Sequence, residues 1–139
     1  MEAKDLSFEE IKVGESVNIE RNIPADDVLR FAELSGDYNP LHTDKKYAEG
    51  TLFKEQVVHG MFLASLVSQL IGMKLPGKRS LILREALEFK KPAFIGDTVN
   101  ILGKVLFKSE ATKIIEIGIE IHNQHDELLS SGSVQVKTL

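Results

Sequence analysis

The hydrophobic pattern near the start of the chain predicts one strand followed by one amphipathic helix. Apolar and polar residues alternate across Val17–Ile23, which is typical of a β-strand with one buried face. A helix is expected over Pro24–Gly36, because proline suits the first helical turn and glycine suits the residue after the last one. Val28, Phe31 and Ala32 follow the i, i+3, i+4 spacing of a buried helical stripe.

The middle of the chain predicts a loop, a short helical piece and one long apolar helix. The segment Asp37–His42 contains Pro40, which lacks an N–H and biases its neighbour towards extended geometry, so a helix cannot continue through it. A short helical piece is expected from Asp44 to about Glu49. Gly60–Met73 is apolar almost all round, which predicts a helix covered on several sides by other structure.

The remaining apolar runs predict four further strands joined by short turns. The runs lie near residues 81–89, 99–107, 115–121 and 134–136, and in the first of them the odd-numbered positions form the apolar side. Short turns between consecutive strands imply an antiparallel sheet. We therefore expect an α+β fold, a single domain over residues 1–139, in which a curved antiparallel sheet of about five strands surrounds the long helix. An exposed sheet edge favours a homodimer.

Composition narrows the class of protein without identifying its chemistry. The 139 residues carry a formal net charge of −4, which argues against a nucleic-acid binder that relies on phosphate neutralisation. The absence of cysteine excludes disulfides and thiolate sites. No secretory leader is evident at the N-terminus, and the longest apolar stretch is too short and polar for a membrane span. The expectation is a cytoplasmic protein with no nucleic-acid or membrane partner.

Two local features could carry chemistry. Asp37 and His42 place a carboxylate and an imidazole five residues apart in a stiff loop, a pair that suits general acid–base work. The alternative is a turn-capping aspartate and a surface histidine. Gly60 opens the long helix, where an unpaired N–H could approach a developing oxyanion closely. The alternative is that Gly60 only permits close packing.

These features together closely resemble a known family signature. The segment SGDYNPLH (residues 35–42) followed by HGM (residues 59–61) is similar to the signature of the (R)-specific enoyl-CoA hydratases, MaoC-like proteins with the hot-dog fold. The resemblance extends from about residue 10 through LPGK (residues 75–78), FKKP (residues 89–92) and GD (residues 96–97). It implies a lyase that reversibly hydrates trans-2-enoyl thioesters to (R)-3-hydroxyacyl thioesters.

The resemblance also implies roles for five residues. Asp37 and His42 would hold and activate the water, and the Gly60 N–H would polarise the thioester carbonyl. Asn39 would support the loop, and Ser68 matches a serine near the site of the family. The alternative for Ser68 is a serine bonded back to its own helix. The resemblance implies no metal or redox cofactor, and coenzyme A would be part of the substrate.

One position departs from the family pattern. Where many of these hydratases carry a Gly-Gln pair after Leu-Pro-Gly, this chain has Arg84 and Glu85. Strand alternation places Glu85 on the apolar side, where a carboxylate is costly unless it is paired or protonated. A β-bulge or a salt bridge could account for it, or Glu85 could reshape the acyl pocket. The acyl-chain preference is therefore open.

Weaker candidates and rival functions remain. His122 and His125 have a spacing found in metal sites, but they lack a third partner in sequence. The basic residues Lys74, Lys78 and Arg79 could meet coenzyme A phosphates, or could simply complement a helix end. A thioesterase on the same fold and a non-catalytic acyl-binding module are the alternative functions. The choice between coenzyme A and acyl-carrier protein as the carrier is also open.

Overall fold

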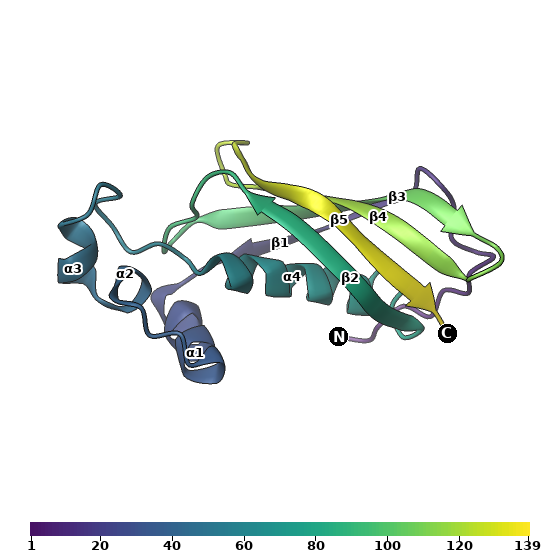
Figure 1. Ribbon diagram of the computed structural model, residues 1–139, viewed down its shortest axis with the longest axis horizontal. Helices are drawn as coiled ribbons and strands as arrows, with labels where there is room; N and C mark the ends of the chain where they lie inside the picture. Colours follow the sequence, from purple (N-terminus) through teal and green to yellow (C-terminus); the bar gives the residue numbers. More distant parts are fainter.

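The computed structural model describes residues 1–139 and contains five strands and four helices. In chain order they are β1 (Ser16–Asn22), α1 (Ala25–Ser35), α2 (Pro40–Thr43), α3 (Lys45–Glu49), α4 (Gly60–Met73), β2 (Ser80–Phe89), β3 (Thr98–Ser109), β4 (Ile114–His122) and β5 (Leu128–Thr138). Figure 1 shows the strands layered over α4, with α1, α2 and α3 gathered beyond one end of that helix. None of the helices combines the length and apolar character needed to cross a membrane.

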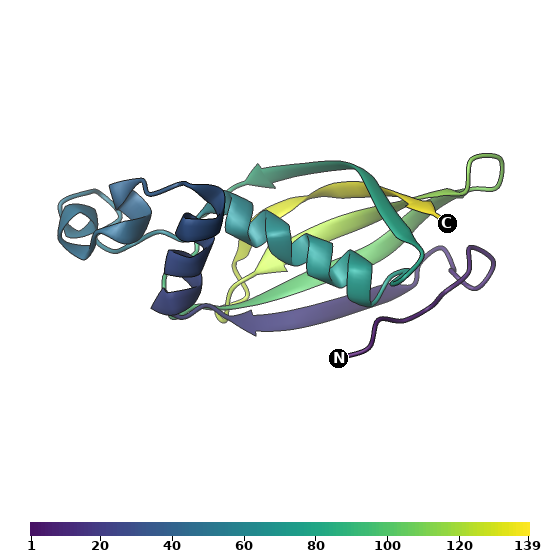
Figure 2. The same ribbon diagram turned by 90° about the horizontal axis from the view of Figure 1, so that it is seen from below.

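The five strands form one antiparallel sheet in the order β1-β3-β4-β5-β2. Figure 2 shows α4 lying along one face of this sheet, between the edge strands β1 and β2. The predicted α+β architecture of a hot-dog fold, a sheet curved around a central helix, is confirmed.

The core lies between α4 and the inner face of the sheet. In β4, residues Ile115, Ile117, Ile119 and Ile121 alternate inwards and are almost fully buried, as the period-two pattern predicts. On the helix, Leu70 is completely buried against β3. A methyl group at Gly103 would lie only 2.8 Å from Cδ2 of Leu70, so glycine permits the close approach of helix and sheet there.

The predicted alternation along β2 was wrong at its start. A register shift between Ile82 and Arg84 marks a β-bulge. Before the bulge, Leu81 pairs with Lys137 and therefore faces the outer side, because directly paired residues in antiparallel strands share a face. After the bulge the odd positions face α4, and they include Glu85, which pairs with buried Val134.

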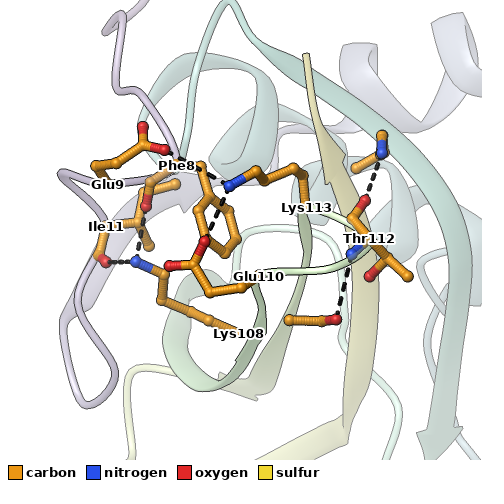
Figure 3. Close-up of polar contacts among 9 residues, drawn as sticks. Phe8, Glu9, Ile11, Lys108, Glu110, Thr112 and Lys113 are labelled. Carbon is orange, nitrogen blue, oxygen red and sulfur yellow. Dashed lines mark hydrogen bonds and ion pairs between the residues drawn. The ribbon is translucent and has the colours of Figure 1, made fainter.

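The N-terminal segment closes the far end of the sheet (Figure 3). The Phe8 ring is buried, with Lys108 Nζ 4.4 Å and Lys113 Nζ 4.6 Å from its centroid. Lys108 also donates to the main-chain oxygens of Phe8 and Ile11. An ion pair of 2.9 Å joins Lys113 to Glu110. These contacts anchor the segment that precedes β1 and leave the opposite end of α4 for the remaining helices.

The three short helices cluster at the N-terminal end of α4. Helix α1 begins after Pro24 and ends at Gly36, which adopts a left-handed φ of 78° as predicted. The turn after Pro40 is itself helical, a difference from the predicted loop. It forms because Asn39 Oδ1 accepts the N–H of Leu41 and proline needs no donor in a first turn. Asp44 caps α3 in the same way.

Candidate active site

Asp37 lies in the connection between α1 and α2. Gly36 turns the chain out of the helix, and the Asp37 N–H donates to the Ser35 hydroxyl at 3.2 Å. The Asp37 carboxylate accepts the main-chain N–H of Asn39 through Oδ1 at 3.1 Å, and its Oδ2 makes no intramolecular hydrogen bond. The carboxylate is exposed at the surface of the single chain. The hydrogen bond to Oδ1 thus orients the carboxylate, and Oδ2 is available to bind a ligand or water.

His42 is fixed to the segment that leads into α4. Its Nδ1 lies 2.6 Å from the main-chain oxygen of Val57, so Nδ1 carries the proton and donates it to that carbonyl. Val57 N–H donates to the oxygen of Leu41 at 3.1 Å, and the Gln56 side chain donates to the oxygen of His42 at 2.8 Å. His42 Nε2 makes no hydrogen bond within the chain and is therefore the ring nitrogen that is available to accept a proton.

His59 is a member of this group that the sequence reasoning missed. The residue is 1% exposed, and its ring stacks on that of His42 with centroids 4.0 Å apart. His59 Nε2 lies 3.0 Å from the main-chain oxygen of Asp37 and donates to it. The motif HGM contained this histidine, but only the fold shows that it reaches back to the loop.

Gly60 follows His59 directly and begins α4. Its N–H has no hydrogen-bond acceptor within the chain, as expected for the first residue of a helix. The position where a Cβ would stand lies 3.3 Å from the ring of Phe89 on β2. The free amide of Gly60 therefore lies beside the Phe89 ring and directly follows His59, whose ring stacks on that of His42.

The fold brings together three of the predicted residues and leaves one apart. Potential ligating atoms of Asp37, His42 and His59 all lie within 4.8 Å of one another, and Gly60 adjoins this group. Asn39 supports the loop through its cap on α2. Ser68 lies eight residues beyond Gly60 on α4, about 12 Å along the helix.

The comparisons with known proteins agree with this arrangement. A family model described as the MaoC like domain matches residues 8–124. The chain belongs to the MaoC-like domain family. It is 39% identical over 132 residues to an (R)-specific enoyl-CoA hydratase from Aeromonas caviae, covering 95% of this chain and 98% of the relative.

Solved structures show the same relationship for this MaoC-like chain. An (R)-hydratase from A. caviae described as involved in PHA biosynthesis superposes with a TM-score of 0.90 at 40% identity, over 93% of this chain and 98% of the other. An unliganded R-hydratase from Pseudomonas aeruginosa gives a TM-score of 0.94 at 30% identity, over 98% of this chain and 87% of the other. The predicted family membership is confirmed.

The Asp37, His42 and His59 side chains are close enough together to be considered as metal ligands, because their potential ligating atoms lie within 4.8 Å of one another. His42 Nδ1 and His59 Nε2 already donate to main-chain oxygens. A metal could therefore be held only through the other nitrogen of each ring. At the other predicted metal candidate, His122 Nε2 lies 3.8 Å from Glu120, and no third ligating group joins them.

Glu85 faces the helix side of β2 in this MaoC-like protein, as predicted. Glu85 is exposed in the single chain, and partial burial of its carboxyl raises the pKa above its ordinary value. The structure contains neither a salt bridge nor a side-chain hydrogen bond for it, so the predicted salt-bridge explanation is not met within one chain. The predicted β-bulge is present two residues earlier and does not turn Glu85 outwards.

The basic residues near the end of α4 are occupied by other contacts. Lys74 Nζ donates to the main-chain oxygen of Asn18 at 2.8 Å. Ion pairs join Lys78 to Glu2 at 3.2 Å and Arg79 to Asp5 at 2.7 Å. These residues lie at the opposite end of α4 from Gly60, which favours the interpretation that they have a structural role at the helix end.

The hollows on the outer face of the sheet do not belong to the candidate site. A hollow of about 680 Å³ lies on the outer face of the sheet, lined by polar residues that include Asn18 and His122. A second, of about 430 Å³, lies between Leu102 and Gly132 on the same face. Neither includes Asp37, His42 or Gly60. The predicted acyl cavity is therefore not one of these hollows.

Proposed function

We propose that this MaoC-like protein reversibly hydrates trans-2-enoyl thioesters to (R)-3-hydroxyacyl thioesters. The observation that carries this proposal is the grouping of Asp37, His42 and His59, whose polar side-chain atoms lie within 4.8 Å of one another, together with the unpaired N–H of Gly60, the residue that follows His59. Hydration of a conjugated thioester needs a proton acceptor, a proton donor and a group that stabilises negative charge on the thioester oxygen. The names of the two hydratase relatives support the same reaction.

Each group takes one step in the proposed reaction. The water oxygen forms a bond to C3 while His42 Nε2 takes one of its protons, and the Asp37 carboxylate accepts a hydrogen bond that orients the same water. The electrons of the C2=C3 bond move towards the thioester carbonyl, whose oxygen receives the Gly60 N–H. The proton held by the Asp37–His42 pair then passes to C2, so that the enzyme regains its initial protonation state. One such oxyanion donor contributes about 3 kcal/mol to transition-state stabilisation.

A homodimer is part of this proposal. Strand β2 is an edge strand whose Leu83 is 51% and Phe89 50% exposed in the single chain. Unpaired edges with large apolar side chains favour pairing with another strand. Because Phe89 stands beside Gly60, a second copy on this edge would also help to enclose the acyl chain.

Several finer assignments stay predictions. We propose coenzyme A or acyl-carrier protein as the carrier of the acyl group, a reaction without metal or redox cofactor, and a cytoplasmic location. Ser68 and Asn39 are proposed as supporting residues. Because Ser68 lies about 12 Å along α4 from Gly60, it would meet the acyl chain rather than the water.

The experiment that tests the function offers the purified protein crotonyl-, hexenoyl- and longer enoyl-CoA. Hydration removes the ultraviolet absorbance of the conjugated thioester without releasing thiol, and chiral chromatography should identify the (R)-3-hydroxy product. Thiol release with the conjugation intact would instead support a thioesterase. Tight binding without turnover would support an acyl-binding module, and either result would contradict the proposal.

A further inference from the structure

We infer that His59 is a positioning residue that holds both halves of the Asp37–His42 pair in place. The inference rests on the proposed function and assigns to His59 a role that the reaction scheme above does not use. His59 lies at the N-cap of α4, between the buried Val58 and the Gly60 amide. It can therefore connect the helix that carries the oxyanion donor to the loop that carries the acid–base pair.

The connection to Asp37 is a single hydrogen bond. His59 Nε2 donates to the main-chain oxygen of Asp37 at 3.0 Å, across 22 residues of sequence. All other hydrogen bonds of residues 36–39 are made to neighbours within five positions along the chain. The exposed loop thus has one hydrogen bond to a distant element, and His59 supplies it.

The connection to His42 is a ring contact. The two imidazoles stack with centroids 4.0 Å apart and planes 27° from parallel, and Phe31 packs edge-on against His59 at 4.9 Å. His42 is tethered at Nδ1 by the Val57 oxygen, so the His59 ring supports the face of a ring that is already fixed at one edge. Together these contacts restrict where His42 Nε2 can point.

The cost of burying His59 shows that it is not simply core packing. Its Nδ1 is buried and has no hydrogen-bond partner. An unsatisfied buried nitrogen costs folding free energy that a phenylalanine of similar shape would avoid. The benefit of the imidazole over an apolar ring at this position is therefore the Nε2–H that reaches Asp37.

Two substitutions separate the two contacts. His59→Phe keeps a ring against His42 and Phe31 but removes the donor to Asp37. His59→Gln keeps a donor of similar reach but removes the ring. Small displacements of catalytic groups cost up to about a hundredfold in rate. We expect kcat for crotonyl-CoA hydration to fall at least about tenfold in His59→Phe, with KM within about threefold, and to fall by less in His59→Gln, which keeps the donor to Asp37 and loses only the ring contact.

The exposed His125→Gln variant is the matched control and should retain parental kinetics. A His59→Phe enzyme with kcat within about twofold of the parent would overturn the inference. So would a His59→Gln enzyme as inactive as His59→Phe, because the donor would then have no value of its own. Circular dichroism and thermal unfolding identify variants that have lost the fold.

Amide hydrogen exchange tests the same inference without turnover. The N–H groups of Asn39 and Leu41 should exchange at least about tenfold faster in His59→Phe than in the parent, and less so in His59→Gln. Unchanged exchange in folded His59→Phe would overturn the positioning role. A parent protein that hydrates no enoyl thioester would refute the proposed function alone, while exchange would still decide whether His59 holds the loop.

Discussion

At the scale of single residues, hydrogen bonds to the main chain decide which atoms are left for chemistry. The Val57 oxygen occupies Nδ1 of His42 and leaves Nε2 free, and the Asn39 N–H occupies one oxygen of Asp37 and leaves the other. The amide of Gly60 is free because the first turn of a helix has no acceptors for its donors. In each case, the atom that is free for chemistry is the one that the local main-chain hydrogen bonds do not use.

The raised pKa of Glu85 predicts how the stability of the folded protein changes with pH. Its pKa is raised by burial, so the folded chain holds this proton more tightly than the unfolded chain. Stability is therefore lost as pH rises from the ordinary pKa through the raised one, and the loss is absent below about pH 4. We expect Glu85→Gln to be more stable than the parent at pH 7 and to lose that advantage near pH 4. Urea unfolding at the two pH values measures the difference in free energy of unfolding between Glu85→Gln and the parent. A difference that does not change with pH would contradict the explanation.

At the scale of elements, the bulged edge strand depends on glycine at a point of close approach. A Cβ at Gly132 in β5 would stand 1.8 Å from the main-chain oxygen of Ala86 in β2. Backbone atoms in a paired strand cannot move aside as the end of a flexible side chain can. The β2–β5 pairing therefore requires a residue without a side chain at this position.

The corresponding prediction compares two glycines. Gly132→Ala should destabilise the protein by more than about 3 kcal/mol, because β2 must separate from β5 to relieve the clash. Gly72→Ala in α4 meets no atom within 4 Å and should stabilise the helix by up to about 1 kcal/mol. Denaturant unfolding of both variants provides the test. A Gly132→Ala protein as stable as the parent would show that β2 is not held as described.

The helices and strands also show which features of the fold could be predicted from the sequence. Periodicity predicted α4, α1 with its Gly36 cap, and the inward isoleucines of β4, because each depends only on local spacing. A β-bulge was considered for Glu85, but its position after Ile82 was not predicted, because one extra residue leaves no mark in an alternating pattern. The role of His59 was missed for a related reason. Its partners Asp37 and His42 are 22 and 17 positions away in sequence, and only the fold brings them within contact.

At the scale of the whole molecule, the site and the sheet edge lie side by side. Phe89 ends β2 next to Gly60, and the β2 edge continues away from it with Leu81 and Leu83, each 51% exposed. A second copy added at this edge would bury these side chains and extend the sheet across both chains. Assembly and substrate enclosure would then depend on the same strand.

Sedimentation velocity tests this assembly. The parent should sediment as a dimer, and replacing both Leu81 and Leu83 by Glu should shift it towards the monomer, because the charges cannot be buried at a paired edge. Leu106→Glu is the matched control, since Leu106 on β3 is also 51% exposed but lies away from β2. A monomeric parent, or dissociation caused equally by Leu106→Glu, would contradict the proposed interface.

The most direct measurement of the central claim is the rate of crotonyl-CoA hydration in Asp37→Asn and His42→Ala, with His125→Ala as the control. Removing a general acid–base group typically costs at least about a hundredfold. We therefore expect kcat/KM to fall by at least about a hundredfold in each of the first two variants, with thermal unfolding close to that of the parent, and to be unchanged in His125→Ala. Near-parental turnover in either folded Asp37→Asn or His42→Ala would contradict the account.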